Sequence, residues 1–104
     1  MKLETLKIEN LTKGYLQEIV GILGVVTSDL EERHNRLKGH EHLVYELLLK
    51  IHKRNNKDTQ EGKKYYKLSM TKGEAFIFVQ VFSKDNFQSP ALSYVLPQLH
   101  QKLA

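Results

Sequence analysis

Histidine is the side chain in this sequence whose chemistry most readily suggests catalysis or metal binding. Five occur: His34, His40, His42, His52 and His100. A zinc-protease site needs two histidines four residues apart on one helix face, with glutamate beside the first, and no pair here has that pattern. The chain has no cysteine, which excludes a disulfide framework and any thiolate metal site. We therefore predict no metal and no cofactor.

Other catalytic motifs are also missing. The run Gly21-Ile22-Leu23-Gly24 lacks the lysine-serine ending of a phosphate-binding loop, and no serine stands in a nucleophile-elbow sequence. A small ribonuclease would need cationic groups converging on a sheet. Its candidate arginines, Arg33, Arg36 and Arg54, all precede the predicted hairpin. The sequence therefore favours a binding protein over an enzyme.

Positive charge is concentrated in residues 50–72. This segment contains two acids, Asp58 and Glu61, and eight basic residues: Lys50, Lys53, Arg54, Lys57, Lys63, Lys64, Lys67 and Lys72. The whole chain carries a formal charge of +4, so the remaining residues are close to neutral. A basic segment of this kind favours a polyanion or an acidic protein surface, although a solvated lysine-rich loop has the same composition.

The length and hydropathy pattern indicate one domain over residues 1–104. A chain of 104 residues can bury a single core. The longest apolar run, 19–26, is interrupted by Gly21 and Gly24 and is far shorter than the roughly 20 residues of a membrane span. The first residues do not form a secretory signal, so we expect a cytoplasmic protein that does not associate with membranes.

The N-terminal half predicts a strand and about three helices. Alternation over 3–9 indicates a short strand, and a stripe from Leu11 indicates a helix that Asn10 or Thr12 caps and that ends near Gly24. The capping-box pattern Ser28-Asp29-Leu30-Glu31 predicts a second helix over 28–38, ended by Gly39. Residues 41–54 fit both a helical stripe and strict alternation, and their Leu, Glu and Lys content favours helix. Residues 55–62 read as a loop.

The C-terminal half predicts a hairpin and a helix. Residues 64–71 alternate, Lys72-Gly73 offers a two-residue turn, and 74–82 is apolar on both faces, which predicts a second strand. Ser89-Pro90 has the form of a helix cap followed by proline in the first turn, and Pro97 interrupts the apolar stripe that follows. The expected class is α+β: about three N-terminal helices, an antiparallel hairpin with a short N-terminal third strand as an option, and a C-terminal helix.

The segment from Gly62 to Glu74, GKKYYKLSMTKGE, resembles the wing of winged helix-turn-helix transcription regulators of the PadR and MarR type. The resemblance implies that 28–38 is the first helix of the motif and 40–54 the recognition helix. Acids at Glu41 and Glu46 would repel phosphate. Backbone contact by Lys63, Lys64, Lys67 and Lys72, with Tyr65 stacking or donating a hydrogen bond, is the mode of binding that we expect.

Two hypotheses about function remain open from the sequence. The first is a DNA-binding regulator, with double-stranded DNA as the favoured nucleic acid, in which the terminal helices could join two copies as a homodimer. Its candidate contact residues are Lys53, Arg54, Lys57, Lys63, Lys64, Tyr65, Lys67 and Lys72. The second is a protein-interaction module that docks on a partner, such as an acidic protein surface, through the apolar segment 76–82 or the C-terminal helix.

Overall fold

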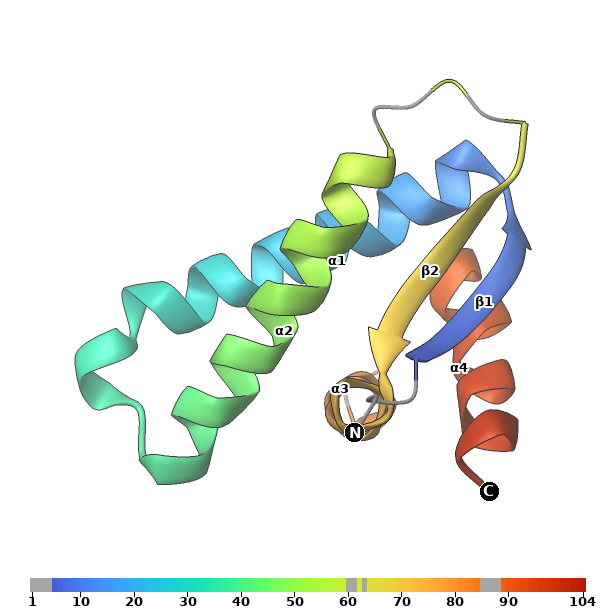
Figure 1. Cartoon of the computed structure of the whole chain (residues 1–104). Coiled ribbons are helices and arrows are strands. Elements are labelled where there is room, and N and C mark those ends of the chain that lie inside the picture. The colour runs from blue at the N-terminus through green and yellow to red at the C-terminus, as the bar shows by residue number, and fades with distance from the viewer. Residues whose placement is uncertain (1–4, 60–61, 63, 85–88) are drawn as a thin grey trace.

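The computed structural model describes residues 5–59, 62, 64–84 and 89–104 (Figure 1). The described elements follow in this order: β1 (Thr5–Leu11), α1 (Lys13–Glu32), a short 3-10 turn (His34–Arg36), α2 (Gly39–Asp58), β2 (Tyr66–Thr71), α3 (Lys72–Lys84) and α4 (Pro90–Leu103). The expected α+β class is confirmed in this coarse form. Among the described residues, no helix combines the length and the apolar character that a bilayer crossing requires.

Helix α1 begins where the sequence predicts but does not break where predicted. The hydroxyl of Thr12 accepts a hydrogen bond from the amide of Tyr15 at 3.2 Å, which confirms Thr12 as the cap. The predicted end near Gly24 and restart at Ser28 are wrong, because α1 is continuous to Glu32. Its buried stripe crosses both glycines without a change of phase: Leu16, Ile19, Val20, Leu23, Thr27 and Leu30. Burial along this face outweighs the low helix propensity of glycine.

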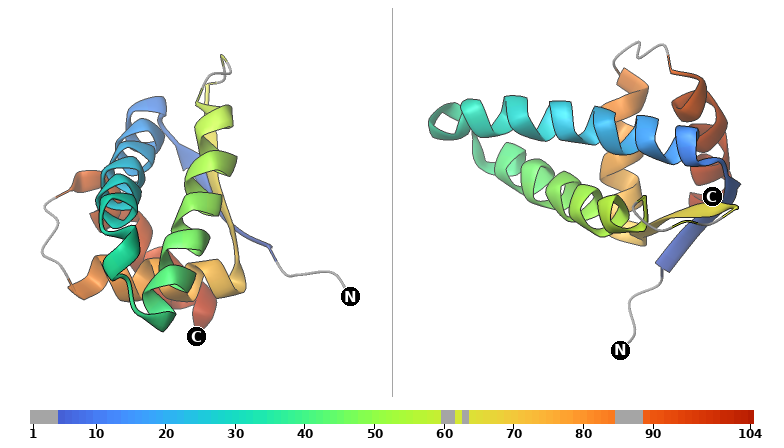
Figure 2. Two further views of the ribbon diagram at one scale, coloured as in Figure 1. Left: turned by 90° about the vertical axis from the view of Figure 1, so that its left-hand side faces the viewer. Right: turned by 90° about the horizontal axis from the view of Figure 1, so that it is seen from above.

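Helix α2 confirms the helical interpretation of 41–54 and extends it in both directions. Gly39, predicted to end a helix, instead begins this one. The amide of Lys38 donates to the carboxylate of Glu41 at 3.2 Å, so an acid in the first turn satisfies a free backbone group. At the other end α2 continues to Asp58, into the predicted loop 55–62. The helices α1 and α2 run in opposite directions and lie side by side (Figure 2).

The predicted hairpin is half wrong. Strand β2 matches its first arm, but the second arm, 74–82, is helix α3. The amide of Glu74 donates to the Thr71 hydroxyl at 3.2 Å, and the amide of Thr71 donates to the Glu74 carboxylate at 2.8 Å. These reciprocal bonds form a capping box, which starts a helix at Lys72 in place of the expected turn. The apolar residues then separate at helical spacing, with Ala75, Phe78, Val79 and Phe82 buried and Phe76 52 % exposed.

Strand β2 pairs antiparallel with β1, its partner from the far end of the described chain. Lys7 lies opposite Ser69 and Ile8 opposite Leu68, and the register shifts between Ile8 and Leu11, where Asn10 has a φ of 62°. One face of this two-stranded sheet is solvent-facing. The other face is buried in the core, and in Figure 1 α4 lies behind the sheet, α2 lies beside β2, and α3 lies at one end.

Helix α4 confirms the predicted cap. The Ser89 hydroxyl accepts a hydrogen bond from the amide of Leu92 at 3.2 Å, and Pro90 is the first helical residue. The helix continues through Pro97 to Leu103. The Glu18 carboxylate of α1 accepts a hydrogen bond from the amide of Ala91 at 3.0 Å, so one acid fixes the start of α4 against α1.

The two glycines of α1 differ in their surroundings, and we expect alanine to affect them differently. A Cβ atom at Gly21 would meet nothing within 4 Å, whereas one at Gly24 would lie 3.2 Å from the His52 Nε2 atom of α2. Gly21→Ala should raise the free energy of unfolding by roughly 0.5–1 kcal/mol. Gly24→Ala should raise the free energy of unfolding by less, or lower it, because the His52 ring must move to make room for the added Cβ atom. Urea unfolding followed by circular dichroism measures both, and equal gains would contradict the close packing of His52.

Candidate nucleic-acid interface

The structure distributes the predicted contact residues over three elements. Lys53 and Lys57 are exposed on α2, Lys67 is exposed on β2, and Lys72 is exposed at the first position of α3. Lys64 and Tyr65 are exposed just before β2, and the Lys64 ammonium lies 5.6 Å from the centre of the Tyr65 ring. Lys63 lies outside the described residues. Lys72 follows the last residue of β2 and Lys64 precedes the first, so these two lysines belong to opposite ends of the strand.

Arg54 binds a carboxylate within the protein. Its Nη1 atom donates to Glu74 Oε1 at 2.6 Å, and its Nη2 atom donates to Glu74 Oε2 at 3.1 Å. The Glu74 side chain is only 3 % exposed, while that of Arg54 is 40 % exposed. The bidentate pair joins α2 to the start of α3 and leaves Arg54 with little free charge for a phosphate. Among the predicted contact residues, Arg54 is therefore better explained as a structural residue.

The ionisation of this pair follows from its contacts. The hydrogen bond to Glu74 raises the pKa of Arg54 above its ordinary value. Burial opposes ionisation of Glu74, but the hydrogen bonds from Arg54 and from Thr71 together outweigh it and lower the pKa of the Glu74 carboxyl. Both groups are therefore charged at neutral pH.

Asn55, the neighbour of Arg54, binds the outer edge of β2. Its side chain is fully buried. The amide nitrogen donates to the carbonyls of Ser69 and Ile51 at 2.9 and 2.8 Å, and its oxygen accepts from the Ser69 amide at 2.9 Å. The Asn55 amide thus takes the place of a neighbouring strand at Ser69, which fixes α2 against the sheet.

The outward side of α2 is a basic ridge. Lys50, Lys53 and Lys57 are three or four residues apart, so they share one face, and all three are exposed. That face is opposite to Leu48, Ile51 and Asn55, which are fully buried. Glu46 continues the ridge toward the start of α2, so the basic character belongs to the C-terminal half of the helix.

The exposed face of the sheet adds two further lysines. Lys67 alternates with the buried residues of β2, and Lys7 alternates with Ile8 of β1, so both point away from the core. Lys7 is not among the contact residues predicted from the sequence. Only the pairing of β1 with β2, which brings together residues about sixty positions apart, adds Lys7 to the basic segment.

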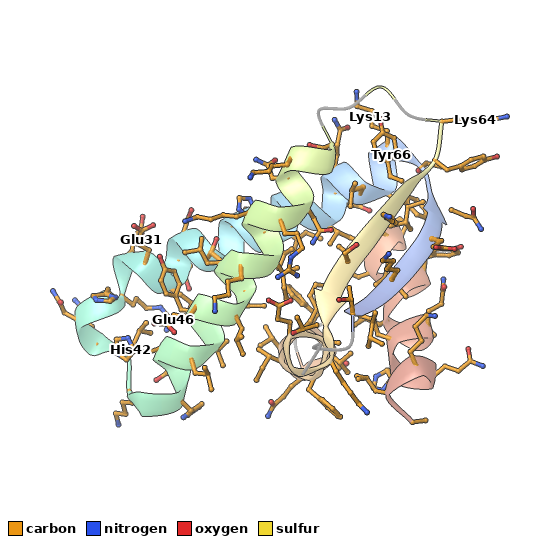
Figure 3. All side chains as sticks on the ribbon, in the orientation of Figure 1. Lys13, Glu31, His42, Glu46, Lys64 and Tyr66 are labelled. Carbon is orange, nitrogen blue, oxygen red and sulfur yellow. The ribbon has the colours of Figure 1, made fainter. Side chains whose placement is uncertain are left out.

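These lysines form what we call the lysine face: Lys7, Lys50, Lys53, Lys57, Lys64 and Lys67. In Figure 1, α2 and the sheet lie in front of α1 and α4, and in Figure 3 the Lys64 side chain extends away from the ribbon. Within the part of the chain that the structure describes, the ion pairs are Arg33–Asp29 and Arg54–Glu74, so no described carboxylate neutralises a lysine of this face.

The histidines do not gather into a site. The rings of His34 and His42 meet edge to face at 5.3 Å, and the His42 Nε2 atom lies 3.1 Å from the carbonyl oxygen of Leu37. His52 packs against Gly24. Over the described ranges, no cluster of three or more histidine or acidic side chains is arranged to hold a metal ion. These histidines have structural contacts at the tip and along the length of the α1–α2 pair.

No family model, curated protein or solved structure matches this chain significantly. The resemblance of residues 62–74 to a winged-helix wing therefore stays a prediction. The function has to be inferred from the geometry of the chain itself.

The buried carboxylate of Glu74 should make the protein sensitive to acid. Because the pKa of Glu74 is lower in the folded state, its stabilising effect is present above the unfolded value of about 4.5 and is lost as the pH falls through the folded value. Glu74→Gln should lower the free energy of unfolding by about 1–3 kcal/mol at neutral pH. The difference between wild type and variant should shrink below the unfolded pKa.

Urea unfolding at neutral and acid pH measures this difference. Glu46→Gln, which changes an exposed acid on the same helix as Arg54, serves as the control and should leave the pH dependence unchanged. A wild-type advantage that persists at the lowest pH would contradict the ion pair.

Proposed function

We propose that this chain is a nucleic-acid-binding protein that contacts the phosphates of double-stranded DNA through the lysine face. The observation that carries the proposal is the set of exposed lysines on α2, beside β2 and on the outer face of the sheet that form no ion pair with a described residue. Each ammonium that replaces a condensed cation on DNA releases that cation, which is the main source of sequence-independent affinity.

The arrangement favours contact with the phosphate backbone over reading of bases. Lysine is a compact point charge that suits a phosphate, whereas bidentate base reading is typical of Arg, Asn and Gln. Arg54 and Asn55, which have suitable side chains, are occupied by Glu74 and Ser69. Glu46 extends the ridge with a charge that repels DNA. We therefore infer weak sequence preference and binding that depends strongly on salt.

Tyr65 adds a second type of contact beside the lysines. Its side chain is 56 % exposed and lies under the Lys64 ammonium. An exposed aromatic ring next to a cation can stack on an unpaired base or donate a hydrogen bond to a phosphate oxygen. Tyr65→Phe, which keeps the ring, and Tyr65→Ala separate these two roles in the same binding assay.

The affinity for duplex DNA should fall steeply as salt rises. A plot of log affinity against log salt concentration should have a slope of roughly −3 to −5 if three to six lysines contact phosphates. The double variant Lys53→Glu, Lys67→Glu should weaken binding at least about tenfold and flatten the slope, because two contacts become repulsive. Fluorescence anisotropy with a random-sequence labelled duplex, between about 50 and 200 mM salt, measures both quantities.

A matched control separates the lysine face from net charge. Lys38, which directly precedes α2, and Lys102, which lies in α4, are both exposed and are not part of the lysine face. The variant Lys38→Glu, Lys102→Glu changes the net charge by the same amount and should retain most of the affinity. Equal losses in both double variants, or a flat salt response of the wild type, would refute binding through this face.

A further inference from the structure

The two edges of the sheet differ in whether their outward backbone groups have hydrogen-bond partners. On β2, the amide and carbonyl of Ser69 are bound by Asn55, and the amide of Thr71 is bound by Glu74. Unpaired strand edges invite another strand, and natural proteins usually cover them. Buried side chains of α2 and α3 therefore close the edge of β2 where Ser69 and Thr71 lie.

Among the described residues, none covers the edge of β1 at the corresponding positions, and we call this the open edge of β1. In an antiparallel pair, opposed residues alternate between those that bond each other and those whose backbone groups point away. Ser69 and Thr71 direct their amides away from β1, so their partners Lys7 and Thr5 must point theirs away from β2. No described residue forms a hydrogen bond with these backbone groups of Thr5 and Lys7.

A groove of about 720 Å³ runs along this open edge. Residues of β1 form one wall, and Tyr94, Gln98 and Lys102 of α4 form the other side. These three residues are four positions apart, so they line a single face of α4. The groove therefore offers main-chain partners on one side and a row of polar and aromatic side chains on the other.

A second copy of this chain does not fit the groove through its own β1. Two-fold pairing of β1 strands would continue the sheet, with the buried faces of both copies on the same side. The inner face of β1 is covered by core helices, with Ile8 fully buried. The second copy would bring its own helices to the position that α4 already fills, so the occupant must be a strand without such a cover.

The charges along the groove indicate the chemistry of that strand. Lys7 lies on the exposed face of the sheet and Lys102 on α4, so an added strand would pass between a cation on each side. Neither lysine forms an ion pair with a described residue. Glu9, the carboxylate of the groove, lies next to the bulge at Asn10. Alternate side chains of an extended peptide point to opposite faces, so acids could reach both lysines.

We propose that the open edge of β1 binds an extended acidic segment of a partner protein as an added strand. Backbone hydrogen bonds to Thr5 and Lys7 would provide affinity, and acidic side chains beside Lys7 and Lys102 would provide selectivity. This inference does not depend on DNA binding by the lysine face.

The test uses the full chain and two short probe peptides: acetyl-Val-Glu-Glu-Val-Glu-Glu-amide, which carries glutamates on both faces of an extended strand, and its counterpart with lysine in place of glutamate. Amide NMR spectra should show shifts concentrated at residues 5–9 and 94–102 with the acidic peptide, and slower hydrogen exchange of the Lys7 amide. The lysine peptide should bind at least about tenfold more weakly. Absence of shifts at millimolar peptide, or equal shifts with both peptides, would overturn the proposal.

Two variants show whether the main chain and the charge act as proposed. Lys7→Pro removes the outward amide without removing a bond between β1 and β2, so binding should be lost while the circular dichroism spectrum is retained. Lys102→Glu leaves β1 untouched and should reverse the preference between the two peptides. Retained binding in a folded Lys7→Pro protein, or shifts in the groove with duplex DNA and none with the acidic peptide, would contradict strand addition.

Discussion

The position of α2 against β2 depends on the buried amide of Asn55. Two hydrogen bonds to the main chain of Ser69 and one to the Ile51 carbonyl satisfy the side chain of Asn55, which is fully buried. An unpaired buried polar group costs about 1–3 kcal/mol, so these bonds fix one arrangement of helix and strand more strictly than apolar contact does. Arg54 adds its ion pair with Glu74 at the next position. These contacts also determine the direction of the basic ridge, because the residues of α2 that face the sheet fix which residues of α2 face solvent.

The same contacts explain why α3 is a helix. Residues 74–82 are rich in β-branched and aromatic residues, and alternation alone fits a strand that is apolar on both sides. The decisive signal is local: Thr71 and Glu74 are three residues apart and cap each other, and Glu74 is also held by Arg54. The capping pattern could be read from the sequence, since Thr71 and Glu74 have the same spacing as Ser28 and Glu31. The latter pair lies inside α1, so the pattern alone does not decide between a cap and a helix interior.

The elements that the sequence predicts well are those with a strong end signal and a clear stripe. The Thr12 cap, the Ser89-Pro90 cap, β1, β2 and the helix over 41–54 belong to this group. The error at Gly24 comes from weighting glycine too heavily, because burial along α1 outweighs a penalty of about 1 kcal/mol per glycine. Gly39, which was predicted to end a helix, lies at the start of α2, where Glu41 satisfies a free amide.

The candidate site could be predicted only in part, because some of its contacts join residues that are distant in the sequence. Charge clustering along the chain identified Lys53, Lys57, Lys64 and Lys67, but it could not show that Arg54 is engaged by Glu74. Nor could it show that Lys7 joins the same face, because ion pairing and strand pairing depend on residues distant in sequence. Lys50 could have been added to the contact residues from the sequence alone. Its spacing from Lys53 and Lys57 places all three on one face of a helix.

Lys7 connects the two proposed binding regions. Its side chain belongs to the lysine face, and its main chain belongs to the open edge of β1. An acidic strand on that edge would place carboxylates beside Lys7 and so reduce the attraction of this part of the face for phosphate. Because coupling between two binding sites is reciprocal, DNA on the lysine face would weaken the acidic strand by the same factor. If both ligands bind, DNA and the acidic strand would compete for the charge of Lys7, which the pairing of β1 with β2 places on both binding regions.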